Sequence, residues 1–216
     1  MKSDPRVRIL TAGESTVLLE FTDPKRMRWV AHQLRGAPPP GVLDMLPAAR
    51  TIMVVAEAAS DLAGLRRALA QLAADVDPEQ DMDRAAPQGE VVIPVRYDGP
   101  DLADVARKTG LSRAELIRLH SSTLWRCEYM GFAPGFGYLV SDEVNLDLPR
   151  RKQSRTSVPP GSVALAGRYA AVYPRSSPGG WQLIGTTDMA MWDLAAQPPA
   201  VIQPDTLIRF VDLDNP

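Results

Sequence analysis

After Trp125 the signals of helix formation almost disappear from the sequence. Short apolar runs alternate there with turns rich in proline and glycine, at a spacing of roughly ten residues. The runs occupy residues 125–130, 136–140, 162–166, 170–173, 181–185 and 207–211. Many short strands at this spacing are typical of a β-barrel or a β-sandwich, so a bundle of long helices is excluded.

Proline supports the same conclusion. The chain has 20 prolines among 216 residues, about twice the usual share of ~5%. Proline interrupts helix interiors and cannot donate a hydrogen bond within a central strand. We therefore expect many defined turns and edge positions.

The first 74 residues show a different pattern, in which strands and helices alternate. Apolar strand-like runs cover residues 7–10, 16–21, 42–46 and 51–56. One helix is predicted to begin at Asp23-Pro24, since aspartate caps helices and proline suits the first turn. A second is capped by Ser60-Asp61 and runs to about Ala74. The order ββαββα predicts a small α+β domain with its helices against one antiparallel sheet.

Residues 75–89 are acidic and have little aliphatic pattern, which is typical of a linker. The sequence thus predicts two domains, covering residues 1–88 and 89–216. The second is expected to begin with a strand at 90–95 and a helix at 101–109. Ser112 and Glu115 then form a capping box for a helix that runs to about residue 122.

Charge and cysteine content exclude several classes of protein. A net charge of −2 and a pI of about 5.7 give no basic surface for nucleic acid or a membrane. The single cysteine, Cys127, cannot form an intrachain disulfide. The chain has no long apolar run and no secretory leader pattern, so a cytoplasmic location is expected. No metal-ligand spacing and no glycine-rich phosphate loop is present.

Residues 129–139 form the most unusual segment. They combine three glycines and four aromatic residues with Pro134. Glycine permits close approach of the backbone to a ligand, and proline stiffens a loop. The segment fits the wall of a ligand pocket, and it equally fits a structural corner of a barrel.

Residues 149–187 contain six basic side chains and no aspartate or glutamate: Arg150, Arg151, Lys152, Arg155, Arg168 and Arg175. Arginine binds carboxylates and phosphates with paired hydrogen bonds. Nearby hydroxyl groups and the Gly161 amide could complete an anion site. The pattern therefore favours an anion site or a subunit interface over a solvated basic loop.

Two further features can be explained by a purely structural role as well as by a functional one. His120 ends a predicted helix, where imidazole could act as a general acid or base, although a partly buried helix-end histidine is commoner. Pro178-Gly179 suits a type II turn leading into a strand with Trp181 and Leu183 on one side. A barrel hairpin requires nothing more than this.

The segment Tyr129–Leu139 resembles the "LGFxPGFPYL" signature of the KipI / allophanate hydrolase subunit 1 family. Later blocks of that family match residues 149–151, 159–163 and 177–187, and residues 38–42 and 47–51 also fit. The resemblance covers almost the whole chain. Gly137 departs from it, since the family usually has proline there, and this loosens the loop.

The resemblance implies an α+β fold, with a small N-terminal α+β domain and a C-terminal cyclophilin-like β-barrel. The family includes the B subunit of bacterial 5-oxoprolinase, which implies a heteromer with the A subunit and with the C subunit (KipA, or allophanate hydrolase subunit 2). That complex opens 5-oxoproline, a small molecule, to glutamate with ATP. ATP is thus the implied cofactor of the complex, and this chain is expected to be inactive alone.

Within that hypothesis, His120 is a candidate proton carrier and Arg150 is grouped with it as catalytic. The candidate substrate-binding residues are Gly131, Phe132, Pro134, Gly135, Phe136, Arg155, Gly161 and Ser162. Two alternatives come from the same family. One is inhibition of a sporulation histidine kinase by protein binding. The other is a role in urea or allophanate metabolism related to the carboxyltransferase part of urea carboxylase, with biotin supplied by another chain.

Overall fold

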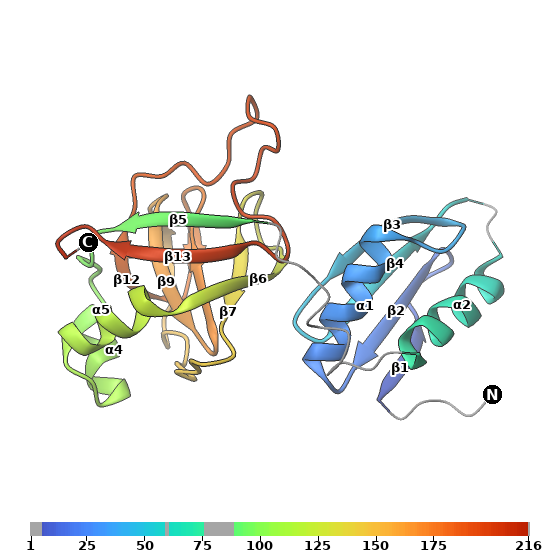
Figure 1. Ribbon diagram of the computed structural model, residues 1–216, viewed down its shortest axis with the longest axis horizontal. Helices are drawn as coiled ribbons and strands as arrows, with labels where there is room; N and C mark the ends of the chain where they lie inside the picture. Colours follow the sequence, from blue (N-terminus) through green and yellow to red (C-terminus); the bar gives the residue numbers. More distant parts are fainter. Residues whose placement is uncertain (1–5, 59–60, 76–88, 216) are drawn as a thin grey trace. The chain divides into compact units, whose positions relative to one another are not determined.

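The computed structural model describes residues 6–58, 61–75 and 89–215. The chain divides into two compact units, one within residues 1–86 and the other within residues 87–216 (Figure 1). The predicted linker at 75–89 and the predicted boundary at residue 88 lie almost wholly outside the described residues. Within the described part, no helix is both long and apolar enough to cross a membrane.

The N-terminal unit has the predicted ββαββα order. Its elements are β1 (Val7–Thr11), β2 (Thr16–Phe21), α1 (Pro24–Gly36), β3 (Val42–Pro47), β4 (Thr51–Ala56) and α2 (Leu62–Ala74). The strands pair antiparallel in the order β1-β2-β4-β3. Alternate strand residues such as Leu19 and Ile52 are fully buried under both helices, which cover one face of the sheet (Figure 1).

The C-terminal unit is built around one large sheet. Its strands are β5 (Glu90–Val95), β6 (Leu124–Met130), β7 (Gly137–Val140), β9 (Ser162–Ala166), β10 (Tyr169–Val172), β12 (Gln182–Thr186) and β13 (Leu207–Asp212). They pair in the order β12-β9-β10-β7-β6-β13-β5. Just beyond β5, Arg96 pairs with Thr186 of β12 through two backbone hydrogen bonds of 2.9 and 2.8 Å. These bonds bring the two edges of the sheet together as a nearly closed barrel.

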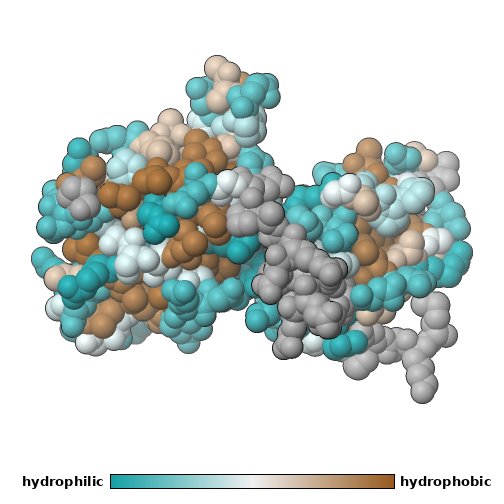
Figure 2. Space-filling view, viewed as in Figure 1, coloured by the Kyte–Doolittle hydropathy of each residue, from teal (hydrophilic) through white to brown (hydrophobic). Residues whose placement is uncertain are grey.

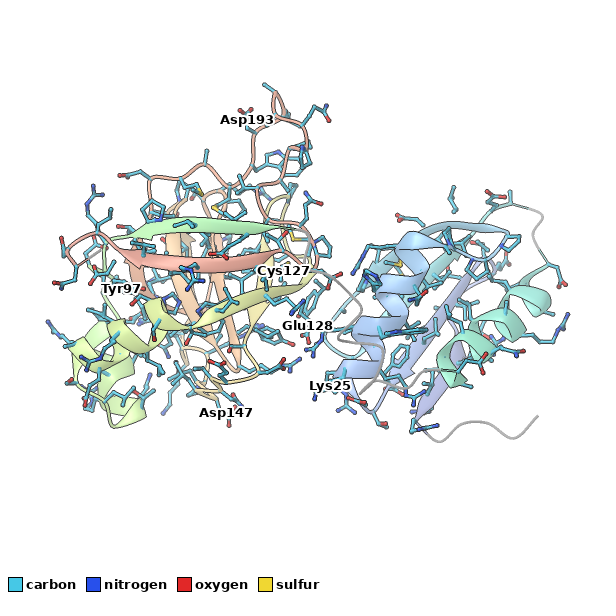
Figure 3. All side chains as sticks on the ribbon, viewed as in Figure 1. Lys25, Tyr97, Cys127, Glu128, Asp147 and Asp193 are labelled. Atoms are coloured by element: carbon cyan, nitrogen blue, oxygen red, sulfur yellow. The ribbon has the colours of Figure 1, made fainter. Side chains whose placement is uncertain are left out.

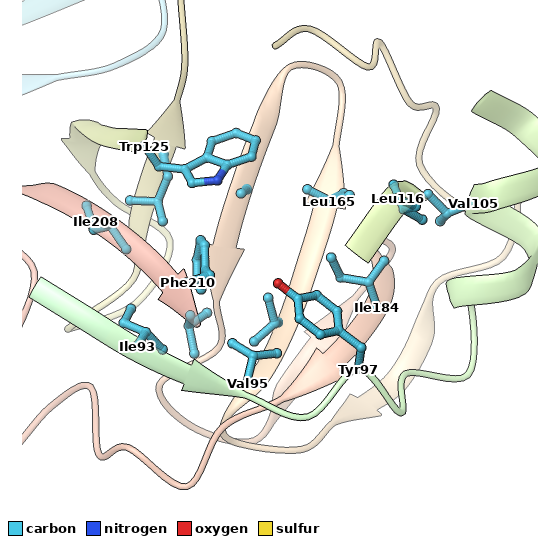
Figure 4. Packing of buried hydrophobic residues seen from close by; sticks show 14 of the residues in the cluster. Ile93, Val95, Tyr97, Val105, Leu116, Trp125, Leu165, Ile184, Ile208 and Phe210 are labelled. Carbon is cyan, nitrogen blue, oxygen red and sulfur yellow. The ribbon is translucent and has the colours of Figure 1, made fainter. Parts of the chain in front are cut away.

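Two helices, α4 (Leu102–Thr109) and α5 (Arg113–Ser122), lie at one end of the barrel and pack against β12 and β13 (Figure 1). The barrel interior is filled by large apolar side chains. Trp125, Ile93 and Phe210 are almost completely buried there, and Tyr97 reaches in beside them (Figure 4). The outer surface mixes apolar and polar side chains (Figure 2).

The α+β class and the barrel are confirmed, and the sandwich alternative is removed. Two short strands were not expected: β8 (Arg155–Val158) and β11 (Ser177–Gly179) pair antiparallel outside the barrel sheet. The type II turn predicted at Pro178-Gly179 is therefore wrong, because these residues extend to pair with β8. Proline is compatible with this position because it lies at a sheet edge beside a register shift.

Candidate functional site

The loop between β6 and β7 folds tightly on itself. The Gly131 N–H donates to the Phe136 carbonyl at 3.2 Å, and the Phe136 N–H donates to the Ala133 carbonyl at 3.0 Å. Phe132 adopts a φ of +66°, which is uncommon for a residue with a side chain, and the residue is 57% exposed. The loop therefore presents Phe132 outward while Phe136 points into the protein. A hollow lies on each side of it.

The smaller hollow, called here the aromatic pocket, has a volume of about 210 Å³. Its lining residues are Phe132, Phe136, Tyr138, Arg150, Ser154, Tyr173, Pro178, Gly179, Gly180 and Trp181. The Phe136 ring is central, because its centroid lies 5.1 Å from that of Tyr138, 5.3 Å from that of Tyr173 and 5.6 Å from that of Trp181. All three contacts are edge-to-face, the arrangement that aromatic rings favour.

The polar groups of the aromatic pocket can all donate hydrogen bonds. Burial raises the pKa of Tyr138 and of Tyr173, while the positive charge of nearby Arg150 partly opposes the rise in both pKa values. Both hydroxyls are therefore protonated at neutral pH and can donate hydrogen bonds. Arg150 is exposed and forms no ion pair with any residue that the structure describes. The pocket thus offers one cation, two tyrosine hydroxyls and the hydroxyl of Ser154.

Two glycines keep these groups in place. A Cβ on Gly179 would overlap the Tyr173 hydroxyl, and a Cβ on Gly180 would lie 2.9 Å from Ser154 Oγ. Both contacts are closer than a real Cβ tolerates, so the chain approaches the pocket here because side chains are absent. Residues 178–181, which the sequence alone explains as part of a plain hairpin, therefore form one wall of the pocket.

Three of the six basic side chains in residues 149–187 have acidic partners in space, although no acid lies within that stretch of sequence. Arg155 Nη2 lies 2.9 Å from both carboxylate oxygens of Asp101, and Arg151 Nη1 lies 2.7 Å from Asp101 Oδ1. Arg168 Nη2 pairs with the buried carboxylate of Glu128 at 2.7 Å. Sequence reasoning missed these acids because both lie outside residues 149–187. Arg155 is therefore paired with Asp101 and does not line the aromatic pocket.

Gly161 and Ser162 use their polar groups within the fold. The Gly161 N–H donates to the Tyr173 carbonyl at 2.8 Å, and the Ser162 hydroxyl donates to the Pro159 carbonyl at 2.8 Å. Neither residue lines the two hollows beside the loop. The structure does not bring them together with Arg150.

His120 lies in the last turn of α5, with its ring in the barrel core. It is 1% exposed, its Nδ1 lies 2.8 Å from the Tyr97 hydroxyl, and its ring centroid lies 4.4 Å from that of Phe210. Burial lowers the pKa of His120 to about 3, so the imidazole is neutral at neutral pH. It lines neither hollow, and the structure does not place it beside the other candidate residues.

The burial of His120 predicts a pH effect on stability. Its pKa in the folded protein, about 3, is below the ordinary value of 6.5, so only the unfolded chain takes up this proton between these values. The free energy of unfolding should therefore fall as pH falls below 6.5, by about 1.4 kcal/mol per unit from this group. Urea denaturation of the wild type and His120→Gln at pH 7 and pH 5 measures it.

Between those pH values the wild type should lose about 2 kcal/mol more than His120→Gln. Carboxylates also titrate in this range, but they are common to both proteins and cancel in the comparison. An equal loss in the two proteins would contradict the assignment of a neutral buried imidazole.

The larger hollow lies on the other side of the loop and has a volume of about 580 Å³. Gly131, Pro134 and Gly135 line it, opposite an arm formed by residues 191–200. Asp193 lies in this arm, which projects from the barrel (Figure 3). The predicted loop residues are thus divided: Phe136 lines the aromatic pocket, these three line the larger hollow, and Phe132 lines both. No charged side chain is among the lining residues of the larger hollow.

Comparison with known proteins gives a consistent result. The family described as "Carboxyltransferase domain, subdomain C and D" matches residues 7–202. The 5-oxoprolinase B subunit of Escherichia coli O157:H7 is 36% identical over 216 residues, which cover 95% of this chain and 96% of that protein. The protein of the same name from Bacillus subtilis is 30% identical over 230 residues, covering 97% and 94% of the two chains.

A solved structure shows the same fold. The crystal structure of TTHA0988 superposes with a TM-score of 0.76 at 34% sequence identity, over 94% of this chain. The match spans 40% of the length of that protein, so TTHA0988 carries a further long segment beyond the shared part.

Proposed function

The chain belongs to the family of carboxyltransferase domain subdomains C and D, and from this we propose that it is the B subunit of a 5-oxoprolinase. The observation that carries the proposal is identity of 30–36% over nearly the full length of proteins with that name. Such coverage includes both units of the chain, and it leaves no large segment of these relatives unmatched.

The proposed reaction is the opening of 5-oxoproline to glutamate. Water adds across the lactam and the carbon–nitrogen bond breaks, coupled with hydrolysis of ATP to ADP and phosphate. The two hollows beside the loop do not fit ATP. The larger one is lined by no charged side chain, and the smaller one holds only about 210 Å³. We therefore place ATP in neither hollow and derive no step through it in this chain.

The partners in this proposal are the A and C subunits of the same enzyme. The word "subunit" in the relatives' names supports an assembly of several chains. The further segment of TTHA0988 supports a second polypeptide that functions together with the shared part. In the part of the chain that the structure describes, nothing favours the kinase-inhibitor alternative. The urea-related alternative has weaker support, because the matches to a urea carboxylase and a urea amidolyase cover only 41% and 49% of this chain.

Reconstitution tests the proposal. The chain is purified alone and together with the A and C subunits of the same organism, and glutamate and ADP are measured after addition of 5-oxoproline and ATP. We expect both products from the three-protein mixture and no glutamate from this chain alone. A mixture of the two partners without this chain is the control. Failure of the complete mixture to form glutamate would overturn the proposal.

A further inference from the structure

We propose that the aromatic pocket binds a small cyclic amide that carries a carboxylate, with Arg150 facing the carboxylate and the aromatic rings facing the ring. This inference rests on the proposed function, because it assigns the substrate of that reaction to one place in this chain. The inference goes beyond the proposed function because it names the residues that bind the substrate and the role of each.

The charge distribution supports a carboxylate. Arg150 is the one cationic side chain among the residues that line the pocket in the described part of the chain, and no acidic side chain lines it. Arg151 and Arg155 lie nearby in sequence, but both are paired with the carboxylate of Asp101. Arg150 is left to pair with a ligand from solution, and an arginine–carboxylate hydrogen bond is stronger than one between neutral groups.

The two tyrosines supply matching donors. Burial raises the pKa of Tyr173, so its hydroxyl keeps its hydrogen at neutral pH and can donate it. Burial raises the pKa of Tyr138 as well, so that this hydroxyl also keeps its hydrogen. Arg150, Tyr138 and Tyr173 all line the pocket, so the three groups can serve the same anion.

The walls and the size of the pocket fit a small ring. Phe136 and Trp181 offer apolar surfaces, and Ser154 adds a hydroxyl that can pair with an amide group. A volume of about 210 Å³ is below the roughly 300–1,000 Å³ that is usual for pockets that hold drug-sized ligands. That space suits a five-membered lactam with its carboxylate, and it is too small for a nucleotide.

The test uses steady-state kinetics of the reconstituted complex. Arg150→Met should raise KM for 5-oxoproline about tenfold or more, since a charge-assisted hydrogen bond is lost. Arg150→Lys keeps the charge and should recover part of that loss. Lys152→Met removes a neighbouring exposed charge that does not line the pocket, and it should leave KM unchanged. An unchanged KM in Arg150→Met would overturn the assignment while the proposed function stands.

Calorimetry on the full-length chain alone distinguishes failure of the proposed function from failure of the pocket assignment. If the wild-type complex forms no glutamate, the proposed function fails, and binding then decides on the pocket by itself. We expect 5-oxoproline to bind the wild type at least about tenfold more tightly than Arg150→Met, and more tightly than 2-pyrrolidinone, which has the lactam ring without the carboxylate. In that case, no binding of 5-oxoproline, or equal binding of the two compounds, would overturn the inference.

Discussion

Replacement of Asp101 by asparagine is expected to lower the free energy of unfolding by about 3 kcal/mol, because a buried carboxylate that serves two arginines loses its charge. Asp101 is 4% exposed. Its oxygens accept hydrogen bonds from Arg151, from Arg155 and, at 2.7 Å, from the N–H of Leu183. Asparagine offers one acceptor oxygen in place of two, and its amide hydrogens face the guanidinium groups. Urea denaturation of both proteins measures the loss.

A surface ion pair provides the matched control. Asp188 pairs with Arg96 at 3.0 Å, but its side chain is 86% exposed. Asp188→Asn should therefore change the free energy of unfolding by less than about 1 kcal/mol, as is usual for solvated pairs. Similar losses in the two variants would show that the Asp101 cluster is energetically an ordinary surface contact.

The Asp101 cluster also shows where sequence reasoning stops. Asp101 lies 50 residues from Arg151 and 54 from Arg155, and these three residues meet only because α4 begins beside β12 and β8. A charge count along residues 149–187 therefore finds the arginines but not their partner. Arg150 lines the aromatic pocket, whereas Arg151 and Arg155 pair with Asp101. No local sequence pattern reveals this difference.

Local signals, by contrast, predicted local structure well. The capping box of α5 is present as expected: the Glu115 N–H donates to Ser112 Oγ at 3.2 Å, and the Ser112 N–H donates to Glu115 Oε2 at 2.8 Å. Asp23 likewise accepts from the Lys25 N–H at the start of α1. These interactions join residues two or three positions apart, so the sequence contains everything that determines them.

The aromatic pocket was predictable in part. Phe132 and Phe136 stood out because aromatic residues among glycines are unusual, and Arg150 because its segment is basic. Tyr173 carries no such signal, since it follows a plain apolar strand, and it reaches Phe136 only through the pairing of β10 with β7. Pairing of strands distant in sequence is set by packing of the whole sheet, which a single segment does not encode.

Gly161→Ala is expected to lower the free energy of unfolding by about 4 kcal/mol, from backbone strain and from steric overlap together. Gly161 has a φ of +75°, which side chains disfavour, and a Cβ here would overlap the carbonyl oxygen of Thr187. The backbone cannot easily retreat, because the Thr187 N–H donates to the Gly161 carbonyl at 2.9 Å and the Gly161 N–H donates to Tyr173. Thermal or urea denaturation measures the effect.

Gly167→Ala separates the two causes and keeps the prediction testable even if Gly161→Ala folds poorly. Gly167 also has a positive φ, of +55°, but nothing lies within 4 Å of the position its Cβ would take. This variant should lose only the strain of a left-handed residue, about 1 kcal/mol. Sequence patterns placed Gly161 among the substrate-binding residues. If Gly161→Ala were instead as stable as Gly167→Ala, the overlap with Thr187 would cost nothing and the structural role would be contradicted. A loss of affinity for 5-oxoproline in the reconstituted complex would then assign Gly161 a role in binding.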